Sequence, residues 1–140
     1  MTPKQIALVQ GSWKNVLAIS DAAATLFYAR LFALDPSLSP MFRGDLKAQG
    51  RKLIGMMTVA VNGLSRIETL VPVIEALGRR HAGYGVKDEH YATVAAALLW
   101  TLEQGLSDEF TPEVKEAWTV AYGVLATTMQ SAAHAEAKAA

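Results

Sequence analysis

Apolar residues recur every three or four positions along nearly the whole chain, which is the spacing that lines one face of an α-helix. No segment alternates between apolar and polar residues over the length of a strand, so the pattern gives no support to a β-sheet. Short polar or proline-containing breaks divide the chain into helical segments. The pattern therefore predicts an all-α fold with helices near residues 2–17, 20–34, 46–64, 69–80, 88–106 and from 111 onward.

The residues at the first breaks support these boundaries. Thr2 can cap the first helix while Gln5 reaches back to the backbone, and Pro3 suits the first helical turn. Asp35-Pro36 ends the second helix, because the residue before a proline is pushed out of helical geometry. A short helical corner is then expected over residues 36–42, ending in Arg43 and Gly44.

The later segments follow the same logic. Pro72 is compatible with the fourth helix if it lies in the first turn, and Gly83 and Gly85 provide the backbone freedom to leave that helix. The alanine-rich residues 131–140 are expected to fray. We see no linker and no internal repeat, so residues 1–140 are interpreted as one domain. In the third helix, the residues expected to point inward are Leu53, Met56, Met57, Ala60 and Val61. In the first helix, the apolar stripe that we expect to face the core consists of Ile6, Val9, Trp13 and Leu17.

Composition narrows the class of protein. The chain has 13 basic and 13 acidic residues, and this zero net charge argues against nucleic acid as the main partner, because a phosphate-binding domain needs a basic face. The lack of cysteine excludes disulfides, zinc–thiolate sites, iron–sulfur clusters and thiol nucleophiles. No apolar run of about eighteen residues predicts a membrane span, and the first residues lack an export signal. We therefore expect a cytoplasmic protein.

His81 is the residue that most constrains the chemistry. It lies on the apolar side of the fourth predicted helix, and the chain has only two other histidines. Neutral imidazole is a good axial ligand for haem iron. A lone histidine on an apolar face is also commonly a hydrogen-bonded core residue, so the residue pattern alone leaves both interpretations open.

Four residues upstream bear on that choice. Gln49 and Leu53 are four apart and share a helix face, so they could address the far side of a flat ligand, although Gln49 could equally be a solvent-exposed amide. Tyr28 lies in an apolar stretch, where its hydroxyl must find either a backbone carbonyl or a ligand. Phe42 is either ordinary core or a ring that stacks on a planar group.

Several motifs follow one another in order along nearly the whole chain. In this order and at these distances they resemble the globin family, and within it the bacterial single-domain haemoglobins, which are similar to the haem domain of flavohaemoglobins. The stretch from Phe110 to Gly123 is also similar to neuroglobin. The motifs are Leu26-Phe27-Tyr28-Ala29-Arg30-Leu31-Phe32 before Asp35-Pro36, Phe42 with Gln49 seven residues on, Leu77-Gly78-Arg79-Arg80-His81 with Tyr91 ten residues on, and Ala117-Trp118-Thr119-Val120-Ala121-Tyr122-Gly123-Val124.

The resemblance implies a globin fold, a three-over-three helical sandwich that encloses haem b (iron protoporphyrin IX) between the third and fourth helices. By the same matching, His81 is the proximal iron ligand, and Tyr28, Gln49 and Leu53 face the bound gas. No catalytic residue is expected. The further haem contacts that it implies are Phe42 packed on the ring, Lys52 and Arg80 at the propionates, and Leu77, Val86 and Tyr91 around the proximal side.

Tyr91 matches a proximal tyrosine that, in the bacterial members, joins a hydrogen-bond network ending in a glutamate. Here the aligned position is Ala133, with His134 next and Glu136 a turn away. The resemblance therefore implies an incomplete network and little electron push from the iron ligand, so peroxidase-like activity is not expected. We expect His90 at the surface or the propionate edge, and His134 in solvent.

We expect a haemoglobin that binds O2 reversibly, because Tyr28 and Gln49 are uncharged donors that favour the partial negative charge of bound O2 over CO. An enzymatic alternative is a nitric oxide dioxygenase, which needs a separate reductase because the chain has no flavin or nicotinamide domain. A haem-based gas sensor and a helical interaction domain without haem are further alternatives. The expected partners are O2, CO and NO, and the expected state is a monomer or weak homodimer.

Overall fold

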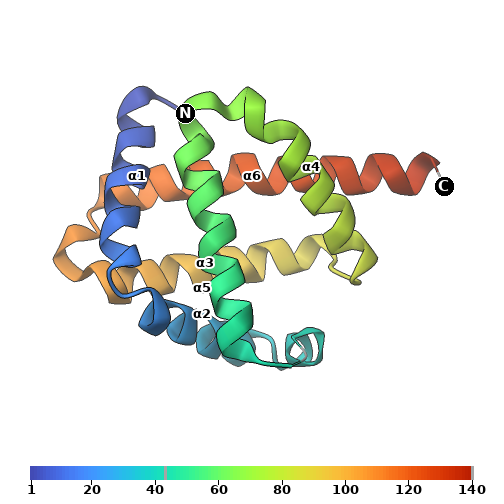
Figure 1. Cartoon of the computed structure of the whole chain (residues 1–140), viewed down its shortest axis with the longest axis horizontal. Helices are drawn as coiled ribbons and strands as arrows, with labels where there is room; N and C mark the ends of the chain where they lie inside the picture. Colours follow the sequence, from blue (N-terminus) through green and yellow to red (C-terminus); the bar gives the residue numbers. More distant parts are fainter. Residues whose placement is uncertain (43, 140) are drawn as a thin grey trace.

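The structure is a computed structural model that describes residues 1–42 and 44–139, with side chains through Ala135. Helices make up most of the described chain, and no strand occurs within it, so the predicted all-α class is confirmed. Figure 1 shows their arrangement. The elements are α1 (Pro3–Leu17), α2 (Ser20–Leu34), η1 (Pro36–Met41), α3 (Leu46–Asn62), η2 (Gly63–Arg66), α4 (Ile67–Gly83), α5 (Asp88–Leu106), η3 (Ser107–Glu109) and α6 (Pro112–Ala139).

Local sequence rules set the ends of the first helices. Thr2 Oγ1 accepts from the Gln5 N–H at 3.1 Å, and the Thr2 N–H donates to Gln5 Oε1 at 2.9 Å, which confirms the capping box. Asp35 is extended, with φ −147°, and Pro36 opens the 3-10 turn η1. Arg43, which we expected at the end of this corner, lies outside the described residues.

The start of α4 differs from the prediction. The turn η2 carries the chain directly from α3 into α4, so α3 ends at Asn62 and α4 begins at Ile67, two residues early. Pro72 consequently lies inside α4 rather than in its first turn, where it removes one backbone hydrogen bond. The partly buried Ile67 packs against two core clusters, and this tertiary contact extends the helix past the expected boundary. At the other end Gly85 has a φ of +87°, as an exit glycine requires.

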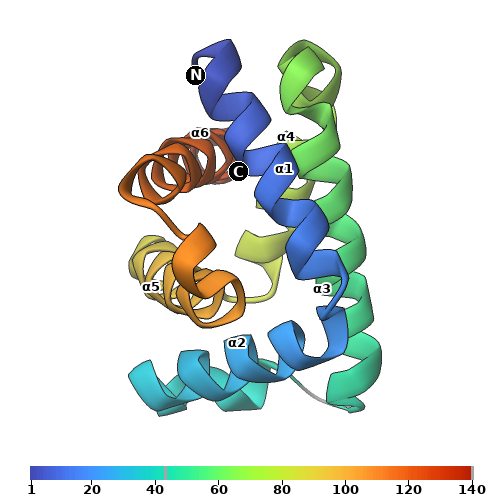
Figure 2. The same cartoon turned by 90° about the vertical axis from the view of Figure 1, so that its left-hand side faces the viewer.

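The helices form two layers. α1, α3 and α4 lie on one side, α5 and α6 on the other, and α2 crosses at one end (Figure 2). α4 and α1 pack on α6, while α2 packs on both α5 and α3. With α2 grouped with α5, on which it packs, and α6, this arrangement is the expected three-over-three sandwich. α6 continues through Ala139, and the fraying of residues 131–140 stays a prediction.

Tryptophans join the two layers in the core. The rings of Trp13 and Trp118 are 5.8 Å apart, and Trp118 Nε1 donates to Ser12 Oγ at 2.8 Å. Trp13 Nε1 donates to a threonine hydroxyl on α3, so both buried indoles have partners. Leu17 and Met56, which we expected to point inward, are 37% and 36% exposed. Leu17 is the last residue of α1, and Met56 lies at the edge of the apolar stripe of α3, so both predictions were wrong.

Two helix crossings are close enough to require glycine. A Cβ atom at Gly78 of α4 would lie 2.6 Å from the Cα and 2.7 Å from the carbonyl carbon of Met129 in α6. A Cβ atom at Gly50 of α3 would lie 3.0 Å from the Cβ of Ala24 in α2. These crossings fix α4 on α6 and α3 on α2, and so they position the residues that follow.

Among the described helices, none is by itself long and apolar enough to cross a membrane. α1 and α2 pass a test of length and composition only as a pair, and the pair is bent by 101°.

Candidate functional site

His81 lies half-buried in the last turns of α4. Its Nδ1 is 2.8 Å from the carbonyl oxygen of Leu77, one turn earlier. Because a carbonyl only accepts, Nδ1 carries the proton and Nε2 is the unprotonated nitrogen. Within the described part of the chain, Nε2 has no hydrogen-bond partner. A histidine whose second nitrogen is fixed by a carbonyl is suited to bind a metal through the free one.

The surroundings of His81 favour its neutral form. Burial lowers the pKa of His81 below its usual value; the hydrogen bond to the Leu77 carbonyl opposes this, and the Arg80 cation lowers the pKa further. Each effect acts on the energy of the imidazolium relative to the imidazole. The imidazole is therefore held in the protonation state that coordinates a metal.

Tyr28 is a buried phenol surrounded by aromatic rings. It is 5% exposed, and its ring packs edge-on against Phe27 and Phe42, with centroids 5.3 Å apart in each case. Phe32, one turn along α2, stacks on it at 6.0 Å. The Tyr28 hydroxyl makes no hydrogen bond to any residue that the structure describes, and its oxygen is not among the fully enclosed unpartnered atoms, so it faces accessible space. Burial raises the pKa of Tyr28 to about 12, so the hydroxyl remains a protonated donor.

α3 brings further expected residues beside Tyr28. A Cβ atom at Gly50 would lie 3.9 Å from Tyr28 Cε2, so the turn that begins at Gln49 borders the phenol. Leu53 and Phe42 pack in the same apolar cluster as Tyr28. Gln49 is half-buried, and its amide makes no hydrogen bond to the described residues. The structure thus gathers the four upstream residues around one end of α2 and α3.

The expected proximal residues lie in a second apolar cluster. Leu77 and Tyr91 both pack on Ile74 and its neighbours in α4 and α6. Val86 is half-buried, and its N–H donates to the carbonyl oxygen of His81 at 3.0 Å. The remaining two expected contacts, Lys52 and Arg80, are exposed and form no ion pair with a described residue.

The Tyr91 hydroxyl has no partner among the described residues, and the expected incomplete network stays a prediction. The Tyr91 carbonyl oxygen accepts from the Tyr122 hydroxyl at 2.6 Å. Burial, and then the charge of Asp88, raises the pKa of Tyr91. Ala133 is half-buried and offers no polar group, and the side chain of Glu136 lies outside the described residues.

The other two histidines differ from expectation. His90 is 8% exposed, so the expected surface position is wrong; its Nδ1 accepts from the Lys87 N–H at 2.9 Å and caps α5. His134 is exposed, as expected, yet it contacts Asp88 across 46 residues of sequence. The one signal for this contact was that Gln130 and His134 are four apart and share a face of α6.

A small cavity of about 60 Å³ adjoins Leu53 in the core. The polar groups around it direct their hydrogen bonds elsewhere: Trp13 binds Thr58, Thr101 binds the Ala97 carbonyl, and Tyr122 binds the Tyr91 carbonyl. A water molecule needs two or more polar partners in such a space, so the cavity favours apolar occupants.

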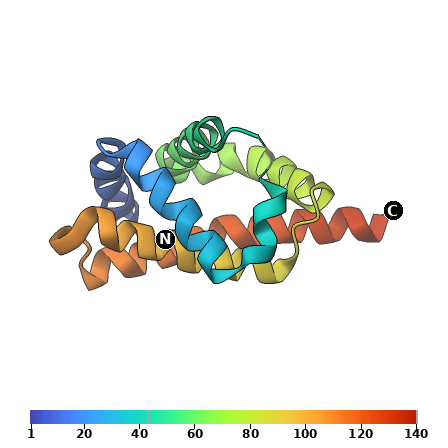
Figure 3. The same ribbon diagram turned by 90° about the horizontal axis from the view of Figure 1, so that it is seen from below.

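These residues fit a planar apolar group that contains a metal. The cluster around Tyr28 comes from α2, η1, α3 and α5, and it is separate from the cluster around Ile74 in α4 and α6. α3 and α4 diverge after η2 (Figure 1), and the η1 corner lies on the same side as the α4–α5 corner (Figure 3). An oriented imidazole with a free nitrogen can ligate haem iron, and the two apolar clusters can pack on a porphyrin ring, so the residues present fit haem.

An all-helical sandwich with these donors is compatible with a helical haem protein. The Globin family model matches residues 25–129, and the chain belongs to the globin family. Membership of this family makes it a haem-binding and gas-binding protein.

The comparisons with single proteins agree with the family. The chain is 33% identical over 126 residues to a "Flavohemoprotein" of Bacillus subtilis, covering 88% of this chain and 32% of that protein. It is 27% identical over 129 residues to a "Flavohemoprotein" of Vibrio cholerae, and the match covers 90% of this chain and 33% of that protein. It therefore spans about a third of these relatives. A bacterial globin from Campylobacter jejuni has the same fold, with a TM-score of 0.86, 24% identity and coverage of 98% of this chain and 99% of that one.

Proposed function

We propose that this globin binds O2 reversibly at a haem b held between α3 and α4, with His81 as the iron ligand. The observation that carries the proposal is the Tyr28 hydroxyl, a donor in a 5% exposed side chain with no partner among the described residues. A donor in such an apolar setting has no described protein partner to satisfy it, and a bound gas would give it one. When bound, the haem supplies the iron atom at which a diatomic gas is held.

The chain's own residues have distinct roles in this proposal. The Leu77 carbonyl fixes the His81 ring, so Nε2 points in one direction. Tyr28 and Gln49 donate hydrogen bonds to a gas that carries partial negative charge, as bound O2 does, and discriminate against CO. Leu53 limits access of water. The other contacts that we propose are Phe42, Leu77, Val86 and Tyr91 on the ring and Lys52 and Arg80 at the propionates.

The Tyr28→Phe variant tests the donor. Loss of one hydrogen bond worth roughly 1–2 kcal/mol should raise the O2 dissociation rate about 5- to 30-fold, with a smaller change for CO. Stopped-flow displacement of O2 measures both rates. Tyr122→Phe is the matched control, because its hydroxyl already donates to the Tyr91 carbonyl and should not act on the gas. An unchanged O2 rate in Tyr28→Phe contradicts the role of Tyr28.

The His81→Gly variant tests the iron ligand. We expect the purified protein to show the absorption bands of haem, and the variant to lose its axial ligand. Added imidazole should restore the original spectrum, because it can occupy the space left by the side chain. If the variant keeps its pigment and the same axial coordination without imidazole, another residue holds the iron.

A nitric oxide dioxygenase is a second candidate, favoured by the similarity to flavohaemoproteins about three times as long. In this reading the chain would work with a separate reductase. Catalytic removal of NO by the globin together with a cellular reductase and a nicotinamide donor, over many turnovers, would support it. Consumption of only one NO per bound O2 would favour O2 binding alone.

A further inference from the structure

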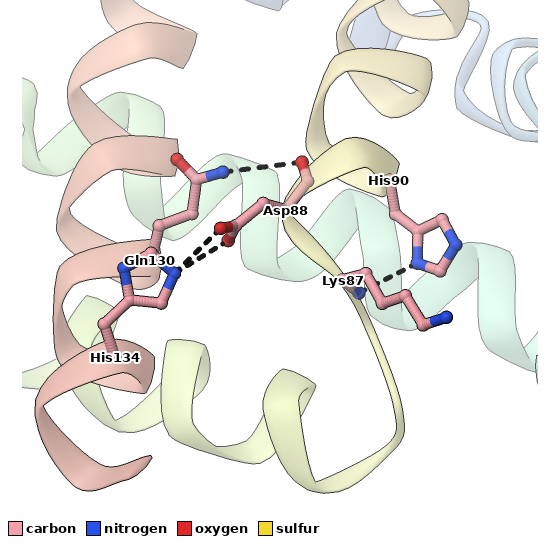
Figure 4. Close-up of polar contacts among 5 residues, drawn as sticks. All are labelled: Lys87, Asp88, His90, Gln130 and His134. Atoms are coloured by element: carbon pink, nitrogen blue, oxygen red, sulfur yellow. Dashed lines mark hydrogen bonds and ion pairs between the residues drawn. The ribbon is translucent and has the colours of Figure 1, made fainter. Parts of the chain in front are cut away.

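The first residue of α5 is tied to the end of α6. Gln130 and His134 project from the same face of α6 towards Asp88 (Figure 4). His134 Nε2 lies 2.8 Å from Asp88 Oδ2 and 3.0 Å from Oδ1, and Gln130 Nε2 donates to the Asp88 carbonyl oxygen at 3.5 Å. Both carboxylate oxygens and the carbonyl of Asp88 therefore face α6.

His90 fixes the other flank of the same turn. The Lys87 N–H donates to His90 Nδ1 at 2.9 Å, and the His90 N–H donates to the Lys87 carbonyl oxygen at 3.0 Å. His90 is 8% exposed, whereas His134 lies on the opposite, solvent-facing side of α5. Asp88 is thus held between a buried cap and an exposed side-chain contact.

The corner before Asp88 is hydrogen-bonded to the last turn of α4. The Val86 N–H donates to the His81 carbonyl oxygen at 3.0 Å, and the Tyr84 N–H is shared between the carbonyls of Arg80 and His81 at 3.1 Å each. Val86, two residues before Asp88, is therefore hydrogen-bonded directly to the backbone of His81.

The charge of Asp88 acts on the same region. Burial is the main cause of the raised pKa of Tyr91, and the negative charge of Asp88 is the second. Tyr91 packs in one cluster with Leu77, whose carbonyl holds the His81 ring. Asp88 therefore connects to His81 both along the backbone and through the packed residues.

We propose that Asp88 is a positioning residue for the imidazole of His81, and that His134 of α6 holds Asp88 in place. The contact restrains the corner of residues 84–87 and, through it, the last turn of α4. The proposal rests on the proposed function in one respect: the orientation of His81 affects a bound gas only if this imidazole is the iron ligand. The restraint on the corner does not depend on that role.

Amide hydrogen exchange of the haem-loaded protein tests the restraint. In His134→Ala, the Val86 amide should exchange roughly two- to fivefold faster, the range expected for loss of one exposed side-chain contact. His134→Arg provides a donor for Asp88 and should restore most of the protection. These variants leave Asp88 in place, so its favourable charge in the first turn of α5 is unchanged.

A matched control is the contact at the other end of the molecule. Asn15 Nδ2 donates to Glu109 Oε2 at 2.7 Å, in an equally exposed position far from the corner in sequence. Asn15→Ala should leave the Val86 amide unchanged. The proposal is overturned if Val86 is unaffected in His134→Ala, or if the Leu102 amide in the buried part of α5 accelerates equally, because the contact would then act on the whole fold.

The iron–histidine stretching band of the deoxygenated protein gives the second measurement. We expect it to shift or broaden in His134→Ala and to return in His134→Arg. If the corner loosens and the band does not move, Asp88 does not position His81. If the unsubstituted protein shows no such band, the proposed function is wrong, while the exchange of Val86 still reports on the contact.

Discussion

Replacement of Gly78 by alanine tests the crossing that positions His81. The added Cβ would meet the Met129 carbonyl oxygen, and it would lie 2.6 Å from the Met129 Cα. Carbon atoms pack at about 3.5 Å or more, so the two backbones must separate by roughly 0.9 Å. Such overpacking costs about 1–3 kcal/mol or more, which exceeds the gain of about 1 kcal/mol from replacing a helical glycine.

We therefore expect Gly78→Ala to lower the free energy of unfolding by roughly 1–2 kcal/mol and to weaken haem retention, because His81 lies three residues further along α4. Urea unfolding followed by circular dichroism measures the first effect, and transfer of haem to an acceptor protein the second. Gly55 of α3 is the matched control: it has no atom within 4 Å of its Cβ position. Gly55→Ala should stabilise by about 0.5–1 kcal/mol. If both variants gain stability equally, α4 and α6 do not approach closely at Gly78.

Two further predictions follow from the described contacts. Because the pKa of His81 is lowered in the folded chain, the unfolded chain takes up a proton at a higher pH than the folded chain does. The free energy of unfolding and haem retention should therefore decrease as the pH falls below about 6.5. Unfolding curves that do not change between pH 8 and 5 would contradict this. Trp118→Phe removes the buried donor to Ser12 Oγ and part of the core, and it should lower the free energy of unfolding by roughly 1–3 kcal/mol in urea, whereas a loss well below 1 kcal/mol would mean that this bond contributes little.

Elements set by local rules were predictable from the sequence. The cap at Thr2, the break at Asp35-Pro36 and the limits of α5 are where the pattern places them. The start of α4 could not be predicted from the sequence, because Ile67 joins the helix through core contacts rather than through a cap. Met56 shows the same limit, since periodicity defines a stripe but not its edge.

The candidate site was predictable in part. Tyr28, Phe42 and Leu53 pack in one cluster, while their roles toward a haem stay predictions. The oriented ring of His81 could not be predicted, because the bond to the Leu77 carbonyl depends on a rotamer. The contact of His134 with Asp88 joins segments 46 residues apart, and the shared helix face of Gln130 and His134 does not by itself identify Asp88 as the partner.

The bond between Trp118 and Ser12 joins residues 106 positions apart, and it has a consequence for how the chain is made. α1 emerges from the ribosome before α6, so the part of its apolar face that packs on α6 stays uncovered until α6 follows. During that interval the apolar stripe of α1 is exposed to chaperones and to neighbouring nascent chains. Synthesis paused before codon 112 should therefore yield a chain that is sensitive to proteolysis within its first helix.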